Sequence, residues 1–158
     1  MLRAIFARNA AIPGSGSGVV ARRDLLIGVG GFDPRLSSLE DIDMWLRLAA
    51  RTAYRCVPEP LTVIRRRGDS MSRDLDRMRA QAAVVLKKNR ALLPAAARGG
   101  FWRYAYAGML TDYAKWEYRA GRRARALRHL LHAGLLSPLG RGRLVGGLLW
   151  AAARGTLG

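Results

Sequence analysis

The chain has 158 residues, half of them hydrophobic and a quarter charged, which is enough for about one domain with a real core and excludes wholesale disorder. Its formal net charge of +17 is unevenly spread: residues 1–74 carry 12 Lys or Arg against 8 acids, and residues 75–158 carry 16 against 3. The second half is a basic module, which suggests an anionic membrane surface, a phosphate-bearing ligand or nucleic acid as its partner.

The two ends of the chain give no signal peptide or membrane span. Arg3, Arg8 and Asn9 interrupt the apolar start, and the longest apolar stretch near the end, residues 144–153, is about ten residues long. A bilayer span needs about 20. We therefore expect a cytoplasmic chain, able to lie at the inner face of a membrane.

Short strands are predicted on either side of a central helix. Residues 19–23 and 57–64 are rich in apolar and β-branched side chains, and Pro58 and Pro60 restrict the second to a sheet edge. The single cysteine, Cys56, excludes an internal disulfide. Its neighbours, residues 54–58, also predict a short strand, which suggests a small buried side chain.

The stretch from residue 28 to 51 organises the first half. A glycine-rich turn carries Asp33, and a serine pair then opens a helix with three carboxylates in its first turn. Its apolar residues recur at helical spacing, so one face should be buried; they are Ile42, Trp45, Leu46 and Ala49.

Two interpretations of these carboxylates stay open. Ser37 followed by Glu40 fits a capping box, which would make the acids a matter of helix capping. The alternative is that they meet a substrate. Asp43 and Arg47, one turn apart, are predicted to form a surface pair.

From about residue 74 the pattern becomes helical throughout. Apolar spacing predicts one helix from Asp74 to before Pro94 and a second from Trp102 to Gly121, a C-terminal cap. Two more helices are predicted around residues 127–135 and 144–152. The pair from 102 to 136 resembles one tetratricopeptide-like hairpin, which would need neighbouring helices to cover it.

Residues 12–74 resemble the C-terminal part of the catalytic domain of family 2 glycosyltransferases, which have the GT-A fold. The resemblance covers about two fifths of the chain and rests on five elements in order. They are Gly16-Ser17-Gly18-Val19-Val20, Arg22-Arg23-Asp24, Gly30-Gly31-Phe32-Asp33, Glu40-Asp41-Ile42-Asp43-Met44-Trp45-Leu46-Arg47-Leu48-Ala49 and Pro58-Glu59-Pro60-Leu61 with the Arg-rich loop after it. It implies a partial α/β domain with few short strands (residues 1–74), followed by an all-α basic region (75–158), mostly helical overall.

The resemblance also implies chemistry. Asp41 would be the general base that deprotonates the acceptor as it attacks a nucleotide-diphosphate sugar with inversion, with Glu40 beside it. Gly30, Gly31 and Asp33 would lie in the substrate site. Arg67 stands where such proteins often carry a histidine, and its guanidinium could pair with the donor's phosphate.

A divalent cation, Mg²⁺ or Mn²⁺, is expected for the family, but no ligand set is identified in this chain. Asp41-Ile42-Asp43 and Asp74-Leu75-Asp76 spell Asp-x-Asp, yet both lie at helix starts, so neither is assigned as a metal site. The family's donor-binding half is missing from these residues. A fragment of a longer enzyme, needing a partner for the donor, is therefore expected, and the acceptor could be a glycan or a lipid-linked sugar in glycan biosynthesis.

Two other functions compete with sugar transfer. Residues 75–158 could be a non-enzymatic module that docks on an anionic membrane; nucleic acid is disfavoured because the aromatic residues have helical core spacing, not the sheet placement that stacks bases. The chain could also be a truncated, inactive reading frame.

Overall fold

The computed structural model describes residues 1–7, 15–63 and 74–155. The chain forms two compact units, Met1–Pro94 and Ala95–Gly158, which are described one at a time. This division falls at Pro94, whereas charge and periodicity change character at about residue 74. Helix α4, which follows that change, belongs to the first unit.

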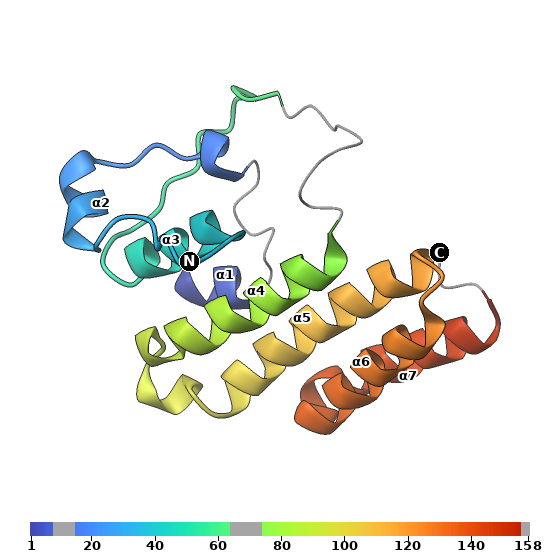
Figure 1. Cartoon of the computed structure of the whole chain (residues 1–158). Coiled ribbons are helices and arrows are strands. Elements are labelled where there is room, and N and C mark those ends of the chain that lie inside the picture. The colour runs from blue at the N-terminus through green and yellow to red at the C-terminus, as the bar shows by residue number, and fades with distance from the viewer. Residues whose placement is uncertain (8–14, 64–73, 156–158) are drawn as a thin grey trace. The chain divides into compact units, whose positions relative to one another are not determined.

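Within residues 1–7, 15–63 and 74–94, the N-terminal unit contains four α-helices and long irregular segments (Figure 1). Its helices are α1 (Leu2–Ala7), α2 (Arg23–Gly28), α3 (Glu40–Ala49) and α4 (Leu75–Lys88), with short 3₁₀ turns at Ser15–Gly18 and Asn89–Leu92.

Helix α3 is the core of this unit. Its apolar residues Trp45 and Leu46 are buried as their spacing predicted, and α1 packs against α3 through buried Ile5 and Phe6. Each such side chain contributes roughly 1.5–3 kcal/mol by leaving water. Tyr54 fixes the chain after α3 by donating its hydroxyl hydrogen to the Trp45 carbonyl oxygen at 3.1 Å. The helix that carries the predicted base is therefore anchored along its length.

The predicted α/β fold is wrong, because no strand forms among the described residues and helices dominate them. The segments 19–22 and 53–63 lack strand pairing, and Val20, Val57 and Val63 are exposed. A strand requires a neighbour to accept and donate its backbone hydrogen bonds, which β propensity alone does not supply. Cys56 is exposed for the same reason, not buried as expected.

The C-terminal unit confirms the helical prediction. A 3₁₀ turn at Ala95–Ala97 precedes α5 (Gly100–Arg119), α6 (Arg123–Leu136) and α7 (Pro138–Ala153). Gly121 ends α5 with a left-handed φ of 78°, as its predicted capping role requires. Across the described residues, none of the helices combines the length and the apolarity needed to cross a bilayer.

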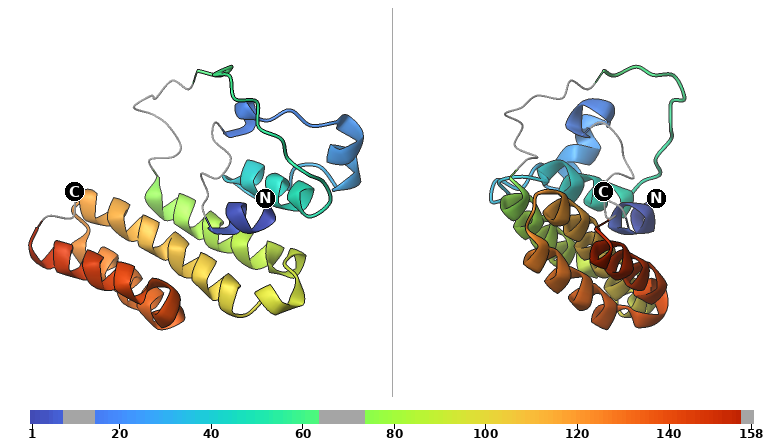
Figure 2. Two further views of the ribbon diagram at one scale, coloured as in Figure 1. Left: turned by 180° about the vertical axis from the view of Figure 1, so that it is seen from behind. Right: turned by 90° about the vertical axis from the view of Figure 1, so that its right-hand side faces the viewer.

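Helices α5 and α6 form a hairpin, and α7 packs against both, so the three run side by side (Figure 2). Tyr113, Leu130 and Ala133 are buried in this unit. The side chain of Glu117 is also fully buried and pairs with Arg122, just past the end of α5. The hairpin thus has the neighbouring helix that one isolated helix pair needs.

Candidate functional site

A left-handed glycine turn is clamped onto helix α3. Gly30 and Gly31 have φ angles of 86° and 65°, a region where other residues are strained. Arg47 donates to the carbonyl oxygens of Val29 and Gly31 at 2.6 and 2.7 Å. Arg51, one turn further along α3, donates to the Gly28 oxygen at 2.7 Å. The backbone of the turn is thus held by two arginines of α3.

Asp43 is the centre of a buried polar cluster, not half of a surface pair. Its side chain is completely buried and pairs with Arg47, which is 2.8 Å away and 16% exposed. Lys88, at the end of α4, lies 2.9 Å from the other carboxylate oxygen, and the Asn89 amide donates to that same oxygen at 2.7 Å. The cluster therefore ties α3, α4 and, through Arg47, the glycine turn together.

Asp33 at the end of the glycine turn joins the same cluster. Lys88 donates to one of its oxygens at 2.5 Å, and Arg35 donates through its backbone nitrogen and guanidinium at 2.9 to 3.1 Å. These bonds lower the pKa of Asp33, chiefly through Arg35 and then Lys88. A carboxylate has about four acceptor positions, and all are used here. A ligand hydroxyl could reach Asp33 only if a donor such as the exposed Arg35 moved away.

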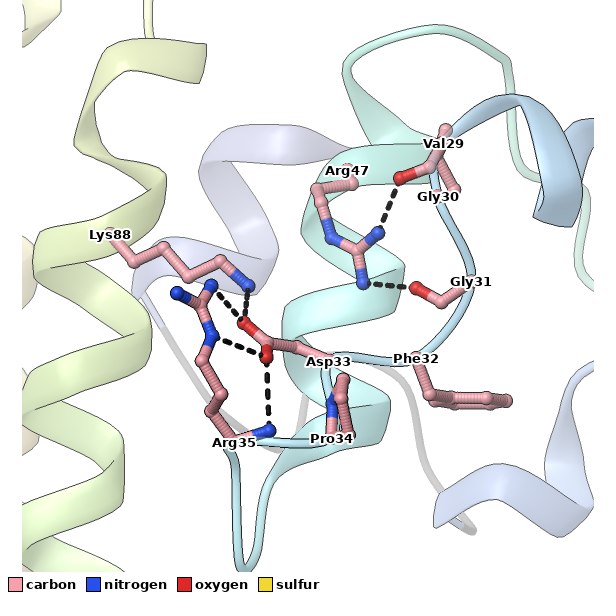
Figure 3. A pocket seen from close by; sticks show the side chains of 9 residues that line it. All are labelled: Val29, Gly30, Gly31, Phe32, Asp33, Pro34, Arg35, Arg47 and Lys88. Carbon is pink, nitrogen blue, oxygen red and sulfur yellow. Dashed lines mark hydrogen bonds and ion pairs between the residues drawn. The ribbon is translucent and has the colours of Figure 1, made fainter.

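A hollow of about 390 Å³ lies over this turn (Figure 3). Its charged residues are Asp33, Arg35, Arg47 and Lys88, to which Asp43 adds a second carboxylate beneath. Three cations against two carboxylates leave one net positive charge, which favours an anionic or hydroxyl-rich ligand. The complete lining is Val29, Gly30, Gly31, Phe32, Asp33, Pro34, Arg35, Arg47 and Lys88.

Glu40 and Asp41 open α3 after a strained residue. Leu39 is the N-cap residue with a φ of 59°, unusual for a large side chain. The predicted capping box is wrong: no side chain caps α3, and the Ser37 hydroxyl instead accepts a hydrogen bond from Arg77 at 3.1 Å. A positive φ just before two acids fits the pattern by which backbone strain gathers at functional sites.

Asp41 differs electrostatically from the two clustered aspartates. It is partly buried, and none of the ion pairs among the described residues includes it. Burial raises its pKa, against the opposing effect of a hydrogen bond from the Ile42 backbone at 2.7 Å. Asp41 therefore holds a proton more readily than an ordinary aspartate, and Asp33 less readily.

The structure brings together only part of the site expected from sequence. Gly30, Gly31 and Asp33 line one hollow, whereas Glu40 and Asp41 are not among its described lining residues. Arg67 lies outside the described residues.

Sequence reasoning missed Lys88 and Asn89 and assigned Asp43 to the surface. The sequence carried only a weak signal that Asp43 is buried, namely its place among the apolar residues of α3. A carboxylate that faces inward at that place needs cations from other parts of the chain. Nothing in the local pattern around residue 88 pointed to Asp33 or Asp43, because the contacts span 45 residues or more.

The described residues offer no ligand set for the divalent cation expected from the resemblance. Within the described ranges, no three His, Cys, Asp or Glu side chains gather as a metal site would require. Asp43 already pairs with Arg47 and Lys88, so it is not available to ligate a metal together with Asp41. Asp74 instead caps α4, accepting from the Arg77 backbone at 3.0 Å.

Comparison with known proteins shows a partial similarity to an uncharacterized protein. The chain is 35% identical over 79 residues to the uncharacterized protein MT1568 of Mycobacterium tuberculosis (strain CDC 1551 / Oshkosh). That match covers 50% of this chain but only 24% of the relative, so the chain spans a minor part of that protein's length. No family model and no solved structure matches.

Proposed function

We propose that the N-terminal unit contributes to sugar transfer from a nucleotide-diphosphate donor, with Asp41 as the general base. The observation that carries the proposal is the different setting of two carboxylates. Asp33 accepts four hydrogen bonds from Arg35 and Lys88, which lower its pKa. Asp41 is partly buried and joins no ion pair among the described residues, and burial raises its pKa. Acids whose environments shift their pKa values in opposite directions are typical of acid–base sites. The order of sequence elements that resembles family 2 glycosyltransferases supplies the reaction class.

In this proposal the residues of the buried cluster hold the substrate in position, and Asp41 takes part in the reaction as the proton acceptor. Ionised Asp41 accepts the proton of the acceptor hydroxyl as that oxygen bonds to the anomeric carbon. The bond from the anomeric carbon to the diphosphate oxygen breaks, and its electron pair leaves with the nucleoside diphosphate, so the configuration inverts. Burial without a paired cation leaves Asp41 more basic than Asp33, which suits it to accept that proton.

The hollow over the glycine turn has the character of a site for a sugar or its phosphate. Glycine backbone at residues 30 and 31 allows close approach, and the net positive charge of the cluster favours a phosphate-bearing ligand. Arg35, whose side chain is 82% exposed, is free to exchange Asp33 for a ligand oxygen at small energetic cost.

The test is binding and turnover by the purified chain. Calorimetric titration with a panel of nucleotide-diphosphate sugars should give saturable heat, and release of nucleoside diphosphate should be measured with glycan and lipid-linked acceptors. Asp41→Asn should lower release by about 10²–10⁴-fold, the usual contribution of a general base, while leaving donor affinity unchanged.

Asp112→Asn is the matched control, because Asp112 is an exposed acid on α5, outside the N-terminal unit. The proposal fails if no donor binds at millimolar concentration either to this chain or to a longer chain that includes the donor-binding half. It also fails if donor turns over equally well in the parent chain and in Asp41→Asn.

A further inference from the structure

Helix α6 carries an apolar stripe that faces solvent. Leu127, Leu131 and Leu135 are 48%, 51% and 83% exposed. They are spaced four residues apart, so they lie along one side of the helix. Helix α6 also has a buried face, which includes Leu130 and Ala133. The stripe is therefore additional to the face that α6 uses for folding.

Another exposed leucine lies at the corner between α6 and α7. Leu139, in the first turn of α7, is fully exposed, four residues after Leu135. Further along α7, Trp150 is 61% exposed and the Arg154 guanidinium lies 4.0 Å from its ring centroid. A row of exposed leucines along one side of a helix is typical of an interaction surface.

Arginines border the stripe, and no acid interrupts it. At 100° per residue, Arg123 and Arg128 fall on either side of the three leucines, and both are exposed. The guanidinium of Arg123 lies 5.8 Å from the Tyr118 ring centroid. Residues 95–158 contain 11 Lys or Arg but only 2 acids, both of which lie on α5. The surface of α6 and α7 is thus apolar and cationic.

We propose that this stripe docks α6 onto an anionic phospholipid bilayer, an interaction beyond the proposed sugar transfer and independent of it. The leucines enter the boundary between headgroups and acyl chains, and the flanking arginines meet lipid phosphates while their aliphatic stems cover the same apolar surface. The positive charge beside the leucines favours an anionic bilayer over the other possible partners of this surface. A second copy of this chain would bring arginines of like charge together, and nucleic acid would leave the leucines in water.

The test uses the full chain with vesicles of phosphatidylcholine alone or of equal parts phosphatidylcholine and phosphatidylglycerol. The chain should cosediment with the anionic vesicles, less at high salt, and not with the neutral ones. Replacing two stripe leucines, Leu131→Glu with Leu135→Glu, should weaken binding at least about tenfold, and Arg123→Gln with Arg128→Gln about tenfold.

Matched controls lie outside this unit. Ile27→Glu, at a residue 65% exposed on α2, and Arg23→Gln should leave vesicle binding unchanged. Because the stripe leucines are exposed, all variants should keep the parent's helical circular dichroism; Leu135→Ala provides a milder change with a smaller loss of binding.

Four results would overturn the proposal. One is equal or absent binding to the two vesicle types. A second is stripe variants that bind as well as the parent. The third is a chain that self-associates in light scattering, becomes monomeric in the leucine variant and ignores vesicles, which assigns the stripe to a second copy. Binding to duplex RNA without vesicle binding would likewise overturn it.

Discussion

The two units each bury a carboxylate completely, yet they do so in opposite ways. In the N-terminal unit, Asp43 meets partners from the end of α4, 45 residues away, as well as Arg47 on its own helix. In the C-terminal unit, Glu117 pairs with Arg122, five residues away, and with no other side chain among the described residues. The first is a long-range contact that sets tertiary structure, and the second is a local one that closes a helix end. The comparison predicts that polar substitutions should damage the first unit far more than the second.

The largest effect is expected for Asp43→Asn. Removing the charge leaves Lys88 and Arg47 facing a neutral group in a buried setting, and breaking such a pair costs about 3–5 kcal/mol. Urea unfolding followed by circular dichroism would measure the free energy of unfolding. Asp112→Asn, at an exposed residue paired loosely with Lys115, should change it by less than about 0.5 kcal/mol. If the two substitutions lowered the free energy of unfolding equally, the buried cluster around Asp43 would contribute no more to stability than an exposed ion pair, which would contradict this prediction.

A smaller loss is expected for Glu117→Gln, about 1–3 kcal/mol. Arg122 is 37% exposed and can be hydrated once its partner is neutral. One carboxylate oxygen of Glu117 has no hydrogen-bond partner within the described residues, so the parent already bears part of that cost. The same unfolding measurement applies. A loss larger than that of Asp43→Asn would reverse the comparison between the units.

The glycine turn should show an effect of about 1 kcal/mol. Gly30→Ala or Gly31→Ala forces a side chain into left-handed backbone, although no atom obstructs the added methyl group. Gly28→Ala is the matched control because Gly28 ends α2 without a positive φ, so alanine there should be neutral or slightly stabilising. Thermal unfolding of the three variants would measure this. Equal behaviour would mean that the turn does not need its left-handed conformation.

The smallest effect on stability is expected for Asp41→Asn, within about 0.5 kcal/mol and toward greater stability at neutral pH. Because burial raises the pKa of Asp41 in the folded state, its ionised form is disfavoured there. Its contribution is favourable below the unfolded-state pKa and is lost as pH rises through the folded-state pKa. A strong destabilisation at neutral pH would show that Asp41 has a structural role like that of Asp43.

The periodicity of apolar residues predicted the helices and their buried faces. It did not predict the features that depend on contacts with distant segments of the chain. The helices of residues 75–153 and the burial of Trp45 followed from apolar spacing, because helix faces are local features of sequence. The strands around residues 20 and 60 were predicted from propensity and did not form, because pairing depends on a second segment.

The site was predictable to the extent that its signals are local. Gly30 and Gly31 were recognisable from composition, because left-handed turns need glycine. The partnership of Asp33 and Asp43 with Lys88 was not, because a lysine at the end of one helix looks like any other surface cation until the chain is folded. Sequence likewise could not show that Asp41, unlike Asp33 and Asp43, forms no ion pair among the described residues, because the ion pairs of these acids depend on the folded structure.

The most direct measurement of the central claim is a carboxyl-carbon NMR titration of the aspartates in the folded chain. The account predicts that Asp41 titrates above the ordinary aspartate range, that Asp33 titrates below it, and that Arg35→Gln moves Asp33 upward. The stability due to Asp33 should be present above its unfolded-state pKa and disappear as pH falls through its folded-state pKa. An Asp41 that titrates at or below the value of Asp33 would contradict its assignment as the proton acceptor.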